Sequence, residues 1–174
     1  MPSAYTTLWT QDRCRELRRR DRVGQRPPVV FSGIHSSLPS WRSTEIGDDM
    51  YAMHVRNGMV YVVCRMRIVD KERHGCCGAQ PANYREPAFP GHGDWEMLGA
   101  QGCSAAAVHV DAMLVWFDRP LPGSLLPELS WRNQRGQTRG LKFIEDGRLI
   151  RHLSLDGVYR LTPESADMLR PFAD

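Results

Sequence analysis

Residues 47–69 read GDDMYAMHVRNGMVYVVCRMRIV and decide the fold. The dipeptide Asn57-Gly58 joins two apolar runs, and it supplies the positive φ angles that a tight type I′ turn requires. In the second run every other residue is apolar, and Arg65 and Arg67 lie at the positions in between. This alternation with a period of two is typical of a strand. The first run is apolar on both sets. We therefore predict a β-hairpin with strands at 49–56 and 59–69, placed inside a sheet.

Helix signals stand toward both ends of the chain. Thr10 is a suitable N-cap for a helix over residues 11–22, and Pro27-Pro28 would end it. Thr162 followed by Pro163 predicts a second helix at the C-terminal end. Asp146-Gly147 is another two-residue turn signal. Further strands are expected over residues 29–31, 112–117, 129–133, 141–144 and 149–161.

Hairpins without helical crossovers indicate a mostly antiparallel sheet, and closure of short strands into a barrel removes exposed sheet edges. We therefore expect an α+β protein: a single domain over residues 1–174, built as a small, mostly antiparallel β-barrel with flanking N- and C-terminal helices. An open α+β sheet is the alternative. Residues 71–105 show little periodicity and are rich in glycine, so they are interpreted as a long insertion, either functional or partly disordered.

Composition limits the class of protein. The chain has 174 residues, 41% of them hydrophobic, and no apolar run of about 18 residues that could span a bilayer. No signal peptide is evident in the first 30 residues. The cysteines are odd in number and two are adjacent, unlike a secreted disulfide framework: Cys14, Cys64, Cys76, Cys77 and Cys103. These features predict a cytoplasmic protein with reduced thiols and no membrane partner.

Positive charge is concentrated near the N-terminus. The net charge is +3, yet residues 1–26 hold seven arginines against three acidic residues. Such a cluster attracts phosphates and speeds association with a polyanion. The alternative is a solvated surface helix. The candidate phosphate-binding residues are Arg15, Arg18, Arg19 and Arg22, together with Arg65 and Arg67 of the hairpin.

The hairpin and its surroundings resemble the PUA-like superfamily of small β-barrels, which includes EVE, ASCH and YTH domains. The matching residues are Trp41 in a loop, Ile46-Gly47-Asp48 before a strand, and GMVYVVCRMRIV after the turn. Residues 140–169, GLKFIEDGRLIRHLSLDGVYRLTPESADML, are similar to the closing strands and terminal helix of EVE-like proteins. The resemblance covers about residues 29–70 and 128–172. It implies nucleic-acid binding, with a modified base held in an aromatic-lined pocket.

The residues around Trp41 suit that role, because an unstacked base needs a flat aromatic platform and polar groups that read its edge. The alternative is that Trp41 plugs one end of the barrel as an ordinary core residue. The candidate base-binding or ligand-binding residues are Trp41, Ser32, His35, Ser36, Ser37 and Trp95. We therefore expect a non-catalytic nucleic-acid-binding domain, for DNA or RNA, that reads a modified or flipped base.

Catalysis is the second hypothesis. An ASCH-like nuclease could use Lys71, Arg65 and Tyr84, or a hydrolase could use the loop over residues 74–96, which contains His92, Asp94 and Glu96. Zinc ligands could be drawn from His74, Cys76, Cys77, His92 and Cys103, but no Cys-x-x-Cys pair is present. We find no P-loop, dinucleotide fingerprint or nucleophile elbow. The sequence thus predicts no metal site, no cofactor and no catalytic residue.

Overall fold

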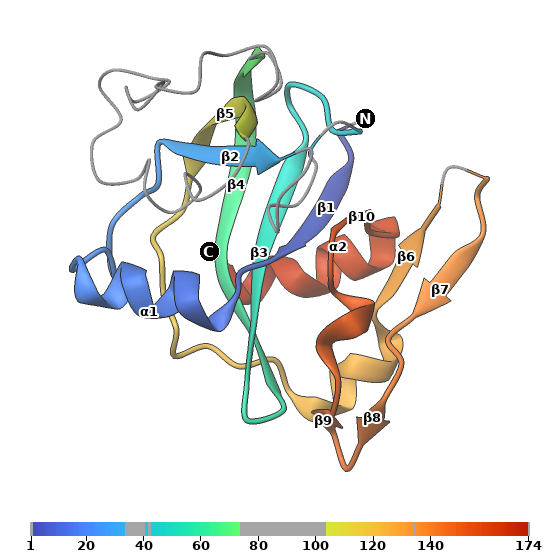
Figure 1. Ribbon diagram of the computed structural model, residues 1–174. Coiled ribbons are helices and arrows are strands. Elements are labelled where there is room, and N and C mark those ends of the chain that lie inside the picture. The colour runs from blue at the N-terminus through green and yellow to red at the C-terminus, as the bar shows by residue number, and fades with distance from the viewer. Residues whose placement is uncertain (1, 34–40, 42, 74–103, 134, 174) are drawn as a thin grey trace.

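A computed structural model describes residues 2–33, 41, 43–73, 104–133 and 135–173. Its main element is a six-stranded sheet with strand order β10-β1-β3-β4-β5-β2 (Figure 1). The six strands are β1 (Ala4–Leu8), β2 (Val29–Gly33), β3 (Asp49–Arg56), β4 (Met59–Arg73), β5 (Ser104–Ala112) and β10 (Val158–Arg160).

The predicted hairpin is confirmed at the centre of this sheet. β3 and β4 pair antiparallel from Asp49 opposite Arg67 to Arg56 opposite Met59. Asn57 and Gly58 have φ angles of 52° and 77°, as a type I′ turn requires. The register shifts between Ala52 and Met53, which marks a β-bulge within the hairpin.

Strand β1 was not predicted from the sequence. It lies between β3 and β10, parallel to β3 and antiparallel to β10. The sheet is therefore mixed, and the first element of the fold is a strand rather than a helix. Residues Tyr5, Thr6 and Thr7 are all buried because both faces of β1 are covered.

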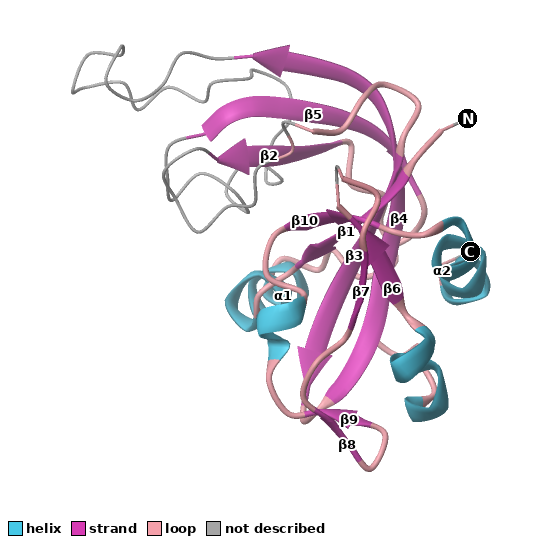
Figure 2. Cartoon of the chain, turned by 90° about the vertical axis from the view of Figure 1, so that its right-hand side faces the viewer, coloured by secondary structure: helices cyan, strands magenta, loops and turns pink. Residues whose placement is uncertain are grey.

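The two predicted helices are present with shifted ends. Helix α1 (Gln11–Arg19) begins after Thr10, whose hydroxyl accepts from the amide of Arg13 at 3.3 Å, and it ends three residues earlier than expected. Helix α2 (Pro163–Leu169) begins after Thr162, whose hydroxyl accepts from the amide of Ser165 at 3.3 Å. Figure 2 shows α1 and α2 on opposite sides of the sheet.

The C-terminal half differs most from the expected strands. β6 (Ser130–Arg132) pairs with β7 (Thr138–Gly140), with one further bridge from Trp131 to Leu161, and β8 (Ile144–Glu145) pairs with β9 (Arg148–Leu149). Short 3₁₀ helices lie at Gly123–Glu128, His152–Ser154 and Arg170–Phe172. The single strand expected over 149–161 is wrong, because a 3₁₀ turn separates β9 from β10. The Asp146-Gly147 turn is confirmed, with φ angles of 48° and 70°.

The predicted β-barrel is also wrong: the sheet is open, with β10 at one edge and β2 at the other. The physical reason lies in β3, where successive residues are buried on alternate faces. Met50 and Ala52 belong to a core cluster with Cys14 and Leu17 of α1. Tyr51 and Met53 belong to a second cluster with Leu169 of α2 and its neighbours. A sheet that is apolar on both faces needs a layer on each side, which the open α+β alternative provides.

Candidate anion-binding site

The α2 side of the sheet carries a cavity of about 680 Å³. One part of its wall comes from the sheet: the residues just before and within β1, the start of β3 and the middle of β4. The other part comes from the end of β6 and from α2 with the residues on either side of it. It is lined by Pro2, Ser3, Ala4, Asp49, Tyr51, Arg65, Arg67, Arg132, Arg160, Leu161, Thr162, Pro163, Ala166, Asp167 and Arg170. Five of these residues are arginines and two are aspartates, so the cavity is strongly positive.

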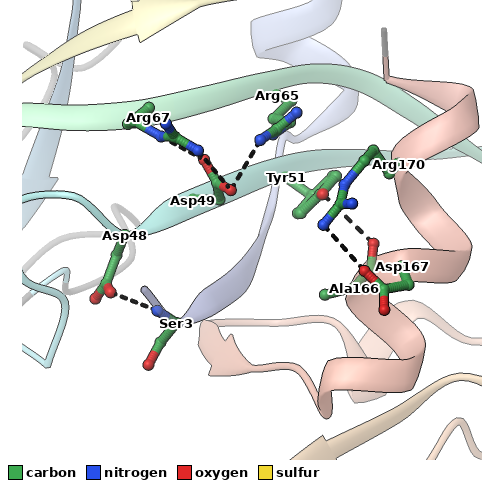
Figure 3. A network of polar contacts seen from close by, with 9 residues as sticks. All are labelled: Ser3, Asp48, Asp49, Tyr51, Arg65, Arg67, Ala166, Asp167 and Arg170. Carbon is green, nitrogen blue, oxygen red and sulfur yellow. Dashed lines mark hydrogen bonds and ion pairs between the residues drawn. The ribbon is translucent and has the colours of Figure 1, made fainter. Parts of the chain in front are cut away.

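Arg65 and Arg67 reach the cavity because strand periodicity puts them on the same face as Tyr51 (Figure 3). Both guanidinium groups contact the carboxylate of Asp49. Arg65 Nη2 lies 3.0 Å from Asp49 Oδ2, and Arg67 Nε lies 3.2 Å from Asp49 Oδ1. Asp49 is 13% exposed and Arg67 is 52% exposed, so part of the Arg67 guanidinium remains open to solvent.

Three further arginines come from distant parts of the chain. Arg132 ends β6, Arg160 ends β10, and Arg170 follows α2. Arg170 pairs with Asp167 across one helical turn at 3.0 Å. Arg132 and Arg160 form no ion pair with any residue that the structure describes, and both are exposed. The donors of these two side chains are available to a ligand, as are those on the exposed parts of Arg67 and Arg170.

Tyr51 lies between Arg65 and Arg170 in Figure 3 and forms part of the cavity floor. Its hydroxyl donates to the carbonyl of Ala166 at 3.4 Å, which connects β3 to α2. Burial raises the pKa of the Tyr51 phenol, while the charge of Arg65 acts in the opposite direction. The phenol therefore stays neutral at physiological pH and keeps its donor for the bond to α2.

A second cavity of about 660 Å³ adjoins the first and shares Ser3, Arg132 and Arg160 with it. Its other lining residues include two acidic ones, Glu45 and Asp48. Asp48 is 6% exposed and accepts from the amides of Ser3 at 2.7 Å and Glu45 at 2.8 Å. We call the arginine-rich cavity the basic cavity and its neighbour the acidic cavity.

The α1 arginines do not belong to this site, because α1 packs on the opposite face of the sheet. Most are engaged locally. Arg15 pairs with Asp12 at 3.1 Å and Arg19 with Glu16 at 2.5 Å, while the Arg18 guanidinium lies 4.1 Å from the centre of the Phe117 ring. Arg22 donates to the side chain of Gln25 at 2.8 Å. The candidate phosphate ligands therefore divide into two groups on separate faces.

Trp41 is 2% exposed and belongs to the core cluster on the α1 side. Its carbonyl accepts from Lys71 Nζ at 3.0 Å, and Lys71 also donates to the carbonyl of Thr44. Ser32 lies in β2. The remaining candidates for base binding, His35, Ser36, Ser37 and Trp95, lie outside the described residues.

Of the alternative catalytic residues, the structure describes only Lys71 and Arg65. Lys71 donates to backbone carbonyls, and Arg65 lines the basic cavity. Tyr84 lies outside the described residues. Of the five cysteines, the structure describes Cys14 and Cys64. The possible zinc ligands and the 74–96 loop are likewise outside them. Within the described parts of the chain, no three His, Cys, Asp or Glu side chains cluster as metal ligands would.

Comparison with known proteins gives no further assignment. No protein-family model matches the chain, and no curated protein matches it in sequence. The described helices include none with the length and apolar character needed to cross a bilayer.

Sequence reasoning identified two of the five cavity arginines. Arg65 and Arg67 stand out because they alternate with apolar residues in a strand. Arg132, Arg160 and Arg170 carry no such signal, since each is a single exposed arginine at the end of an element. Only the pairing of β1 with β10 and the docking of α2 bring them to one place.

Proposed function

We propose that this protein is a non-catalytic nucleic-acid-binding protein that contacts backbone phosphate in the basic cavity. The observation that carries the proposal is the convergence of five arginines from β4, β6, β10 and the end of α2 on one concave surface. Guanidinium groups present planar pairs of donors that match phosphate oxygens, and they keep their charge at any physiological pH.

The shape of the site favours a single strand or a strand end over a duplex. A cavity of about 680 Å³ falls within the range of roughly 300–1,000 Å³ typical of small-ligand sites. A phosphate with its attached nucleoside fits such a volume. A duplex would contact only the rim, since its paired bases and backbones are held on a wider, rigid surface.

Binding is favoured over cleavage because of the chemistry of the lining. An arginine donates hydrogen bonds and stabilises negative charge, but it does not release its proton and is therefore a poor general base. Tyr51, the tyrosine that lines the basic cavity, has a raised pKa and donates to a carbonyl. The nuclease alternative gains no support from the described residues. The role of Trp41 as a base platform stays a prediction, and the proposal does not depend on it.

The salt dependence of binding tests this proposal. The double variant Arg132→Gln/Arg160→Gln removes two exposed guanidiniums that pair with no described residue, so the fold should survive. If both contact phosphates of a single-stranded oligonucleotide, the log–log salt slope should flatten by roughly 1.4, at about 0.7 per contact. Fluorescence anisotropy over a series of salt concentrations measures it.

The matched control is Arg15→Gln/Arg19→Gln, which removes the same charge from α1 on the opposite face. It should leave the slope unchanged. Equal slopes for wild type and the cavity variant, with a flatter slope for the α1 variant, would place the phosphate contacts on α1 and overturn the proposal.

A further inference from the structure

The two adjoining cavities differ in formal charge: the residues that line the basic cavity give +3, and those that line the acidic cavity give zero. The basic cavity holds five arginines against Asp49 and Asp167. Beyond the shared Arg132 and Arg160, the charged residues that line the acidic cavity are Glu45 and Asp48. These charges also act on Tyr5, which lines the acidic cavity. Burial is the largest cause that raises the pKa of its phenol, the charge of Asp48 raises that pKa further, and the charge of Arg160 lowers it. A ligand that spans both cavities meets a surplus of positive charge at one end and, at the other, two carboxylates that balance the shared arginines.

This polarity bears on how a nucleic acid can lie in the site. A strand that continued through both cavities would place a phosphodiester near Glu45 and Asp48, whose charges offset those of the shared arginines, so this second phosphate would gain little. A strand end suits this arrangement better, because its terminal phosphate can occupy the basic cavity while the attached nucleoside, which is uncharged, occupies the acidic one. Exocyclic amines of a base are donors, and the exposed carboxylate of Glu45 is a suitable acceptor.

The charge of the basic cavity also suits a terminal phosphate. A phosphomonoester carries about −1.5 to −2 at pH 7, whereas an internal diester carries about −1. Asp49 already offsets one of the two arginines beside it, and Asp167 offsets Arg170. A surplus of positive charge remains, because Arg132 and Arg160 form no ion pair among the described residues. This surplus of charge matches a dianion better than a monoanion.

We propose that the site recognises a nucleotide end: a terminal phosphomonoester in the basic cavity, with its nucleoside in the acidic cavity. This inference rests on the proposed nucleic-acid-binding function and narrows it to strand ends or mononucleotides. It assigns Arg170 to the terminal phosphate and Glu45 to the nucleoside.

The test compares one single-stranded oligonucleotide in three forms: with a 5′ phosphate, with a 3′ phosphate, and with hydroxyls at both ends. One phosphorylated form should bind about tenfold more tightly than the hydroxyl form, a factor equivalent to ~1.4 kcal/mol. Arg170→Gln should reduce that ratio, because this residue lines only the basic cavity. Arg135→Gln, an exposed residue outside both cavities, should leave it unchanged.

A second variant examines the acidic cavity. Glu45→Arg reverses its exposed charge and should strengthen binding of the hydroxyl-ended strand more than that of the phosphorylated one, so the ratio falls. Adenosine monophosphate, but not adenosine, should compete with the phosphorylated strand. Competition at equal affinity would identify a free mononucleotide as the ligand, and much weaker competition would identify a strand end.

The outcomes separate the two proposals. Equal binding of all three oligonucleotides, lost together in Arg132→Gln/Arg160→Gln, would refute end recognition and leave nucleic-acid binding intact. Absence of binding by every form would overturn both. A ratio insensitive to Arg170→Gln and to Glu45→Arg would place the terminal phosphate elsewhere and refute the assignment.

Discussion

Asp49 competes with any anion that enters the basic cavity. Its carboxylate already accepts from Arg65 and Arg67, at 3.0 and 3.2 Å, so a phosphate must share or displace it. Because the carboxylate is only 13% exposed, water screens it weakly. Asp49 thereby limits the affinity of the site and keeps the two arginines oriented before a ligand arrives.

The variant Asp49→Asn should bind a phosphorylated oligonucleotide about three- to tenfold more tightly, equivalent to ~0.7–1.4 kcal/mol. The reason is that the amide keeps the shape of the side chain but removes its negative charge. Affinity measured at one salt concentration checks this, with the exposed Asp118→Asn as a control for net charge. Weaker binding would mean that Asp49 acts mainly by positioning the arginines.

Two cysteines are sealed in the core, and their chemistry follows from that. Cys14 is 0% and Cys64 is 1% exposed, and burial raises the pKa of each thiol to about 12. In the variant Cys76→Ser/Cys77→Ser/Cys103→Ser, only these two thiols remain. They should not react with a thiol reagent at pH 8 until denaturant is added. Rapid labelling of the native variant would contradict the packing around them.

The same thiols make stability depend on alkaline pH. Each pKa is raised in the folded state from its ordinary value of 9.0, so the unfolded chain loses these protons first as pH rises. The contribution of these two thiols to the free energy of unfolding is complete below pH 9 and is lost as pH rises toward 12. The urea midpoint should fall over this range, and it should fall less steeply in Cys14→Ala/Cys64→Ala.

At the scale of elements, the β8–β9 hairpin docks on the Gly123–Glu128 turn through two glycines. A Cβ placed on Gly123 would lie 2.4 Å from the carbonyl oxygen of Gly147 and 2.8 Å from its Cα. No side chain fits there, so the two backbones approach as closely as they do only because both residues are glycine. The contact fixes the position of the hairpin.

Gly123→Ala should therefore destabilise the protein by about 1–3 kcal/mol, as overpacking does. Gly140→Ala is the matched control, since its Cβ would meet nothing closer than a carbonyl oxygen at 3.6 Å and it has no positive φ. Chemical denaturation compares the two. Equal stability of both variants would show that the hairpin can move away from the turn without cost.

The elements that sequence reasoning located correctly are those with local signals. Asn57-Gly58 and Asp146-Gly147 specify their turns through φ, and Thr10 and Thr162 cap their helices through hydroxyl oxygens. β1 and β10 lack such signals. Their short segments become strands only because each pairs with the other and β1 pairs with β3, at contacts far apart in the sequence.

For the whole molecule, the expected barrel failed for a reason visible in β3. Its apolar residues occupy both strand faces, and burial of both faces outweighs the protection of sheet edges that a barrel would provide. The sheet instead carries one core against α1 and another against α2 and the C-terminal segments. The cavity arginines lie where the second core ends, a location that no local pattern indicates.

Because both cores share β3 and β4, the molecule should unfold in one transition. Leu17→Ala on the α1 side and Leu129→Ala on the other each empty a fully buried site, and each should cost about 2–5 kcal/mol. Circular dichroism and tryptophan fluorescence should give coincident curves for both variants. Separate transitions in either variant would show that the two faces are independent folding units.

The position of β1 between β3 and β10 also has a consequence during synthesis on the ribosome. Pro2 and Ser3 line the basic cavity together with Arg160 and Arg170, so the first and last parts of the sequence meet in it. The nascent chain can form the β3–β4 hairpin early, but it cannot complete this cavity until residue 170 has emerged. The emergence of residue 170, rather than the folding of the central hairpin, is then the step that completes the ligand-binding cavity.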